Sequence, residues 1–325
     1  MKRLFYLSLI ISSFIFLISC EAEFDPKVDL QEVYILNCII RGDSSYQIAT
    51  LSKLYQVSNY DPVSNTIDAS VKFAKIILTD SSSSNQKVIY QFRDSSVART
   101  NSSRYSTPQN FYYIKNFKLT KPGILKIEAT LPNGRILRSS SFIVPLDKYS
   151  VNYFHNDNPK YLSNGSLLFD WSNVKYELDY VKPYFLPEFI IKYSHFESGN
   201  WVKYQTKIPL SYTNVNGEEV PIYPEIESIN RKISYDPEVI RKTIEMISKN
   251  DQDKNNYKIG KVVFMLHVLN NNFATYISLQ QHYKSDFSIS VIEPNYGNVW
   301  GGFGLFGNMH TIQLEVPLNN LINSK

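Results

Sequence analysis

Cysteine is scarce in this sequence: among 325 residues, only Cys20 and Cys38 occur. Cys20 ends the first apolar run, and the lipid modification expected there would leave Cys38 without an intrachain disulfide partner. Cys38 lies in the apolar run 34–40, and a lone thiol in an oxidising compartment is safest when it is buried. We therefore interpret Cys38 as a core residue and not as a nucleophile.

Excess charge is also small. The formal net charge is +4 at pH 7, and it falls to about +2 once Lys2 and Arg3 leave with the N-terminal signal described below. A nucleic-acid-binding domain carries a strong basic patch or stripe, whereas the excess charge here is mild and dispersed. We expect no nucleic-acid partner.

Motifs for metal, cofactor and nucleophile chemistry are missing as well. The sequence has no HExxH and no GxSxG, and its histidines are His155, His195, His267, His282 and His310. They are too scattered to propose a metal site. Residues 302–307 spell GxGxxG, but a dinucleotide fold needs a strand before this motif and a helix after it, and here a strand follows. We expect no metal, no cofactor and no catalytic residue.

One enzymatic alternative stays open beside this non-enzymatic prediction. Glycoside hydrolases place two carboxylates on either side of the scissile bond. The carboxylates that suit this role are Asp170, Glu188, Glu218 and Glu219. Any β-protein offers such pairs by chance, so the alternative needs a polar cleft in which carboxylates converge.

The N-terminal apolar run indicates secretion and lipid attachment. Lys2 and Arg3 form a positively charged start, and the run that follows is shorter than the ~20 residues of a membrane span. It ends in Leu17-Ile18-Ser19-Cys20, which resembles the lipobox of bacterial lipoproteins. The resemblance implies cleavage before Cys20, a diacylglycerol on its sulfur and acylation of the new amine by a fatty acid such as palmitate, which together anchor a protein stably.

An acidic tether follows the lipidation site. Residues 20–31 begin Cys20-Glu21-Ala22-Glu23 and show neither helical nor strand periodicity. Acidic residues directly after a lipidated cysteine resemble surface-export signals of some Gram-negative lineages, although a solvated linker is expected to look similar. We expect a protein held in the outer membrane that faces the cell exterior.

The remaining sequence predicts two β-rich domains. Residues 32–145 contain about six short strands and no helix, which is typical of an immunoglobulin-like or transthyretin-like β-sandwich. Their clearest hairpin has alternating strands on both sides of Pro132-Asn133-Gly134, for which we expect a type I′ turn. Pro145 ends this domain, and residues 146–325 form the second. Residues 1–19 are the signal peptide.

Two short helices are expected in the second domain. Asp236 can cap a helix that starts at Pro237, and Ile240, Ile244 and Ile247 form one apolar stripe that would cover a sheet. Residues 272–283 form the second helix. Residues 261–269 are apolar on both faces and predict a central strand.

A glycine-rich segment near the end has the most unusual composition. Residues 297–307 contain five of the twelve glycines, interleaved with Trp300, Phe303, Leu305 and Phe306. We expect the glycines to adopt backbone angles closed to other residues, with at least Phe303 and Phe306 buried in the second domain as a structural plug. The alternative is a docking patch in which the rings are exposed, and the position of Trp300 is open.

The order of these features resembles the domain-of-unknown-function family 4249 of bacterial lipoproteins. The shared features are the lipobox, an early apolar strand, Pro122-Gly123 before the hairpin, Pro145, and the segment 298–307. The resemblance implies two β-domains on the outer membrane, encoded near TonB-dependent transporters in many cases. It implies no catalytic residues.

These features predict a non-enzymatic outer-membrane lipoprotein. Its expected role is ligand capture for, or an accessory part of, a TonB-dependent uptake system, and the alternative is a free-standing glycan-binding or adhesive module. The flat faces of tryptophan suit sugar stacking, although core packing is the favoured interpretation of Trp171, Trp201 and Trp300. Trp201 and Trp300 are the candidate ligand-binding residues, for a glycan or a peptide.

Overall fold

The computed structural model describes residues 32–54, 66, 68–81, 87–99, 105, 107–119, 123–143, 150–154, 166–172, 182–248, 251, 253–282 and 296–317. Met1–Val33 and Tyr34–Lys325 separate as two compact units, and all elements below belong to the second. The signal peptide, Cys20, the whole tether and the expected boundary at 145/146 lie outside the described residues. In the described part, no helix has the length and apolarity needed to cross a membrane.

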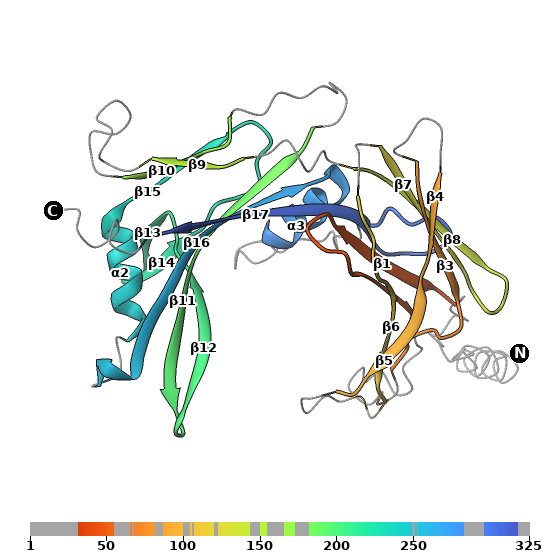
Figure 1. The fold of residues 1–325 in the computed structure, drawn as a ribbon, viewed down its shortest axis with the longest axis horizontal. Helices are drawn as coiled ribbons and strands as arrows, with labels where there is room; N and C mark the ends of the chain where they lie inside the picture. The colour runs from red at the N-terminus through yellow and green to blue at the C-terminus, as the bar shows by residue number, and fades with distance from the viewer. Residues whose placement is uncertain are drawn as a thin grey trace, which may run out of the picture. The chain divides into compact units, whose positions relative to one another are not determined.

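The fold is mainly β with a few short helices, as predicted (Figure 1). One eight-stranded sheet has the order β12(Asn200–Lys207), β11(Tyr184–Glu197), β16(Tyr257–Leu269), β17(Phe306–Val316), β1(Tyr34–Arg41), β2(Gln47–Lys53), β6(Gln109–Ile114) and β5(Arg93–Val97). A four-stranded sheet has the order β4(Val88–Gln91), β3(Lys75–Asp80), β7(Ile124–Thr130) and β8(Ile136–Phe142). Smaller sheets contain β15(Lys232–Tyr235), β10(Leu167–Asp170) and β9(Asn152–Phe154), and β13(Ser211–Val215) with β14(Glu218–Ile222).

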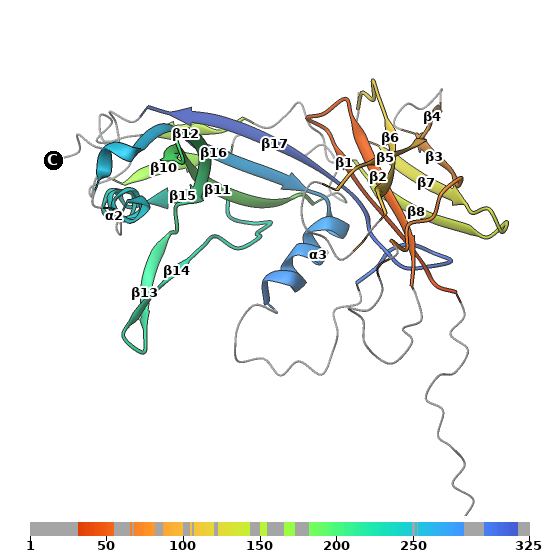
Figure 2. The same ribbon diagram turned by 90° about the horizontal axis from the view of Figure 1, so that it is seen from below.

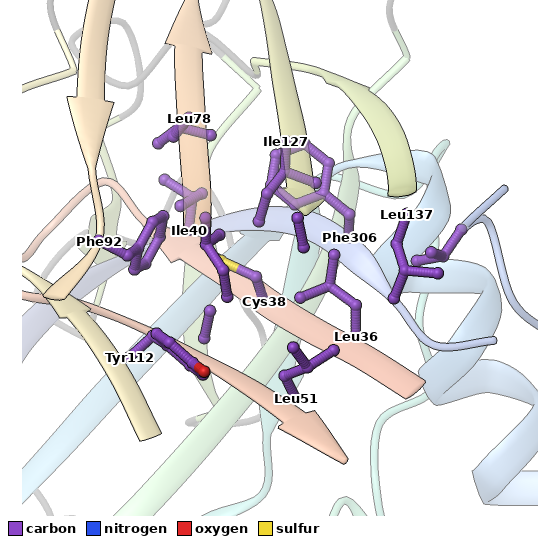
Figure 3. Close-up of a cluster of buried hydrophobic side chains, with 14 of the residues drawn as sticks. Leu36, Cys38, Ile40, Leu51, Leu78, Phe92, Tyr112, Ile127, Leu137 and Phe306 are labelled. Carbon is purple, nitrogen blue, oxygen red and sulfur yellow. The ribbon is translucent and has the colours of Figure 1, made fainter. Parts of the chain in front are cut away.

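The first hydrophobic core lies between the four-stranded sheet and strands β1, β2 and β6 of the long sheet (Figure 3). Side chains of β1 alternate between buried and less buried positions, as a strand with one face on a core requires. Leu36, Cys38 and Ile40 point into this core together with Leu78 and Ile127. Cys38 is a buried free cysteine, and burial raises the pKa of its thiol. The prediction that Cys38 is a core residue is confirmed.

The predicted hairpin is β7 and β8, paired from Ile124↔Phe142 to Thr130↔Ile136. Its connection differs from the expected type I′ turn. Five residues separate the strands, and the Leu131 amide donates to the Arg135 carbonyl at 2.8 Å. Gly134 has a φ of +82°, whereas Asn133 is not among the described non-glycine residues with positive φ. A type I′ turn needs positive φ at both central positions, so the predicted turn type is wrong while the hairpin is confirmed.

The second hydrophobic core packs β11 and β16 against β10, β15 and helix α2(Pro237–Ile247). Asp236 caps the helix as predicted, because its Oδ1 accepts a hydrogen bond from the Glu238 amide at 2.8 Å. Ile240 is buried, and Ile244 and Ile247 pack against the same core, so the predicted apolar stripe does cover a sheet. The second predicted helix is α3(Asn271–His282), and a short 3₁₀ turn, η3(Lys254–Asn256), precedes β16.

Strand β17 contributes side chains to both hydrophobic cores. Its first residues pair in parallel with β1, from Cys38↔Phe306 to Arg41↔Met309. Its remaining length pairs antiparallel with β16, from Leu269↔Met309 to Val262↔Val316. Figure 2 shows β17 as a long strand that starts beside β1 and ends beside β16. Strands from both expected domains therefore form one continuous sheet.

Candidate functional site

The glycine-rich segment lies between β1 and β8 and bonds to both. On one side, the Arg138 amide donates to the Trp300 carbonyl at 3.0 Å and the Trp300 amide donates to the Arg138 carbonyl at 2.7 Å. On the other side, the Leu36 amide donates to the Phe303 carbonyl at 2.9 Å, and the Leu305 amide donates to the Leu36 carbonyl at 3.1 Å. The segment therefore joins an edge of the four-stranded sheet to the long sheet.

Glycine is required here because the segment passes very close to the backbones of β1 and β8. Gly301 and Gly304 have φ of +84° and +118°, a region that favours glycine. A Cβ at Gly304 would lie 2.0 Å from the Leu36 carbonyl oxygen, and one at Gly302 would lie 2.5 Å from the Tyr34 carbonyl oxygen. The prediction that these glycines adopt special backbone angles is confirmed for Gly301 and Gly304.

Two asparagine side chains hold the end of the segment. The Asn298 amide accepts from the Phe306 N–H at 2.8 Å and donates to the Phe306 carbonyl at 2.7 Å, as a neighbouring strand would. The Asn37 Oδ1 accepts a hydrogen bond from the Leu305 N–H at 2.9 Å. These bonds satisfy backbone groups beside the core, where an unpaired group would be costly.

The aromatic residues of the segment separate into buried and exposed members. Phe306 is 0% exposed and belongs to the first core, with Leu305 also buried. Phe303 is 49% exposed and Trp300 is 69% exposed. The plug prediction is therefore confirmed for Phe306 and wrong for Phe303. It is also wrong about the core, because Phe306 packs among residues of range 34–143 and not in the second domain.

A groove of about 880 Å³ lies beside Trp300, on the face of the four-stranded sheet that points away from the core. Buried side chains of β3 and β7 alternate with the groove residues, so the two sets occupy opposite faces. Cross-strand pairing arranges the groove face in two rows. The first row is Gln91, Ile77, Glu128, Arg138 and Trp300, and the second is Ile89, Thr79, Lys126 and Ser140.

Trp300 stands at one end of the first row. Its backbone pairs with Arg138, and directly paired residues of antiparallel chains project to the same side. Asn272 of α3 lies at the same end, where its Nδ2 is 3.4 Å from the Ser140 carbonyl oxygen. Ile89, another exposed apolar side chain, lines the opposite end on β4. The groove thus has apolar ends and a polar centre.

The centre of the groove is charged. The Arg138 Nε donates to the Glu128 Oε2 at 2.8 Å, which pairs these two ions. Lys126 lies in the neighbouring row and forms no ion pair with the described residues. Aromatic, hydroxyl, amide and charged groups in one groove are typical of a binding site for a polar ligand with flat apolar faces.

Trp201, the other candidate, lies on the β11–β12 hairpin. It pairs with Phe196, and the two rings are 5.3 Å apart. Trp201 is 41% exposed, but the Lys258 ammonium lies 3.9 Å from its ring centroid. One ring face is therefore occupied by a cation–π contact, and Trp201 does not line the groove. Trp171 is 2% exposed in the second core, so the core-packing interpretation is confirmed for Trp171 and wrong for the exposed Trp201 and Trp300.

The four carboxylates considered for glycoside hydrolysis lie on three strands, β10, β11 and β14. Asp170 pairs with Lys232 at 3.0 Å on the small sheet, and Glu218 and Glu219 lie on the exposed strand β14. Glu188 of β11 lines a different cavity, of about 430 Å³, together with Lys207 and Glu225. Hydrogen bonding with His267 and pairing with Lys207 lower the pKa of Glu188 to about 2. A general acid needs a raised pKa, so Glu188 does not suit that role.

Histidine and cofactor motifs do not form sites in the described part of the chain. His195, His267 and His310 lie on β11, β16 and β17, and His155 and the side chain of His282 are outside the described residues. No group of three or more histidine, cysteine or carboxylate residues among the described ones could hold a metal ion. The GxGxxG motif runs into β17, as predicted.

Sequence reasoning missed Lys126, Glu128 and Arg138 as groove residues. Their signal was present, because Lys126 and Glu128 occupy the polar positions of the alternating hairpin strand. Alternation shows that these side chains face away from the core but does not show that Trp300 lies beside them.

A scan against protein-family models finds no match for this chain, and a search of curated proteins finds no similar sequence.

Proposed function

We propose that this chain is a lipid-anchored outer-membrane lipoprotein that captures a ligand in the groove beside Trp300. The anchor rests on the sequence Leu17-Ile18-Ser19-Cys20. Ligand capture rests on one observation: Trp300 is 69% exposed, yet its backbone is fixed on both sides at the rim of the groove. The accessory role beside a TonB-dependent transporter follows only from the family resemblance.

The exposure of Trp300 supports binding because exposing a large ring is unfavourable. Burying a large apolar side chain contributes roughly 1.5–3 kcal/mol, and this contribution is mostly absent for Trp300 in the free protein. The neighbouring Val299 and Leu305 are buried, so the same segment reaches the core on both sides of the ring. A rigid exposed tryptophan next to polar groups is the usual anchor of a binding surface.

We expect Trp300→Ala to lose ligand binding without losing stability. The ring contributes little to the core, so the free energy of unfolding should change by less than about 0.5 kcal/mol. A binding anchor should weaken affinity by roughly tenfold or more. Full-length protein in detergent would be titrated calorimetrically with a panel of soluble oligosaccharides and peptides, with Trp201→Ala as the matched control. Unchanged affinity in Trp300→Ala, or a panel without any binder, contradicts the proposal.

We expect Cys20→Ala to release the protein from the membrane fraction, because its lipid is the proposed anchor. Wild-type protein should incorporate labelled palmitate, sediment with membranes, and disappear when whole cells are treated with proteinase K. A periplasmic protein should survive the same treatment. Palmitate in the variant together with membrane sedimentation would refute the lipoprotein assignment, and protection equal to the periplasmic control would place the wild type on the inner leaflet.

The second candidate is a free-standing glycan-binding or adhesive module, which the same groove would serve. The two candidates differ in partner and not in ligand chemistry. Affinity purification of the tagged chain from cross-linked cells separates them. A co-purifying TonB-dependent barrel supports the accessory role, and its absence supports the free-standing module.

A further inference from the structure

The groove face of the four-stranded sheet carries an excess of positive charge. The outward positions of β3, β7 and β8 include three cations, Lys75, Lys126 and Arg138, and one carboxylate, Glu128. Arg138 already pairs with Glu128 at 2.8 Å. Lys126 and Lys75 form no ion pair with the described residues, and Lys126 lines the groove itself. The face is therefore suited to a ligand with negative charge.

The groove offers a ligand mainly side-chain groups, because the backbone groups of its floor are already bonded. Its floor is the face of β3, β7 and β8, whose backbone groups bond to neighbouring strands. At the β8 edge, Arg138 already exchanges both of its backbone bonds with Trp300. An extended peptide gains most of its affinity by adding a strand to a free edge. The β8 edge is thus occupied at Arg138, and a peptide paired with the outer strand β4 would run along that strand and not across the rows to Trp300, which disfavours a peptide.

The arrangement of groups matches the two kinds of surface of a sugar ring. Trp300 and Ile89 offer apolar contact at the two ends, and a ring can stack its C–H face on the tryptophan. Between them lie Lys126, the Arg138–Glu128 pair, Thr79 and Ser140, which can bond hydroxyl and carboxylate groups. The rows cross four strands and the Trp300 segment, a span of about 19 Å at the spacing of neighbouring strands. A ligand of several units is needed to cover it.

We propose that the groove binds an acidic oligosaccharide, with a ring stacked on Trp300 and a carboxylate or sulfate paired with Lys126. This rests on the proposed ligand capture at the groove and names its ligand class. Lys126 supplies selectivity for charge, and Trp300 supplies affinity for any sugar ring. The two residues therefore have separable effects.

The experiment compares one acidic oligosaccharide with its neutral counterpart. Full-length protein in detergent is titrated calorimetrically with oligogalacturonate, with the same oligomer after methyl esterification of its carboxylates, and with oligoglutamate as an acidic peptide. Wild-type protein should bind oligogalacturonate at least tenfold more tightly than the ester or the peptide. Its affinity should fall as salt is raised, because exposed charge pairs are screened.

Variants test the two roles separately. Lys126→Gln should bring the affinity for oligogalacturonate down to that for the ester and remove most of the salt dependence. Trp300→Ala should weaken both sugars equally, and Lys203→Gln on the exposed strand β12 is the matched charge control. Melting temperatures measured alongside confirm that each variant is folded.

Each remaining outcome decides a different claim. Equal affinity for acidic and neutral sugars, tighter binding of oligoglutamate, or an unaffected Lys126→Gln overturns the acidic-sugar assignment and leaves ligand capture standing. Loss of binding in Lys203→Gln as well shows a general charge effect and also overturns it. Binding that persists unchanged in Trp300→Ala overturns the proposed function itself. Absence of oligogalacturonate binding overturns the assignment, and the wider panel then decides whether ligand capture survives.

Discussion

Gly304→Ala should be among the most destabilising single-methyl changes in this chain. An added Cβ would lie 2.0 Å from the Leu36 carbonyl oxygen, 2.6 Å from its carbonyl carbon and 2.8 Å from its nitrogen. These are backbone atoms of a central strand, so they cannot rotate away as a side chain could. The φ of +118° adds strain for any residue with a Cβ.

The expected loss for Gly304→Ala is on the order of 4 kcal/mol, from overpacking of about 1–3 kcal/mol and backbone strain of similar size. Relief of the clash would require breaking the Leu305–Leu36 and Phe303–Leu36 backbone bonds. Urea unfolding followed by circular dichroism measures the free energy of unfolding.

Gly199→Ala is the matched control for Gly304→Ala. Gly199 also has positive φ, +84°, but a Cβ there would meet no atom within 4 Å. It should therefore cost only the left-handed backbone, roughly 1–2 kcal/mol. Equal losses for the two variants would show that close packing of Gly304 against β1 contributes nothing. The described contact between the glycine-rich segment and β1 would then be wrong.

The sequence predicted the fold class well because local periodicity determines it. A near-continuous apolar run identifies β1, alternating side chains identify β7 and the end of β17, and the Asp236-Pro237 start identifies α2. These features depend on neighbours within one element. Local rules are strongest where one face is buried and the other is not.

Long-range pairing is the part that local rules could not supply. The parallel pair Cys38↔Phe306 joins residues far apart in the sequence, and no periodicity in either strand indicates its partner. For the same reason, the sequence pattern places Phe306 in the wrong core and predicts a buried Phe303. Alternation of ring and glycine shows a tightly packed segment, but which rings face inward depends on the strands at its two sides.

The candidate site shows the same limit. Its residue type makes Trp300 a candidate, and the hairpin pattern predicts that Lys126 and Glu128 face away from the core. Only the antiparallel bridge Arg138↔Trp300 brings them into one groove. A bridge of one residue pair in a glycine-rich segment has no sequence signature, because its geometry is set by the chains that flank it.

Phe306→Ala should lower the free energy of unfolding by roughly 3–5 kcal/mol, because the ring is 0% exposed and its removal leaves a cavity. Phe303→Ala, three residues earlier, is the matched control: its ring is 49% exposed, so the loss should stay below about 1 kcal/mol. Both free energies come from urea unfolding, and affinity for a groove ligand is measured well below the melting temperature.

The pair also separates folding from binding. The backbone N–H and carbonyl of Phe306 both bond to the Asn298 side chain. Loss of the Phe306 ring should therefore loosen the segment that carries Trp300 and also destabilise the core. Phe303→Ala leaves those bonds and the core intact, and any loss of affinity in that variant would extend the groove to Phe303. Should Phe306→Ala unfold like the wild type, the ring is not part of the core, and the whole segment becomes an interaction surface.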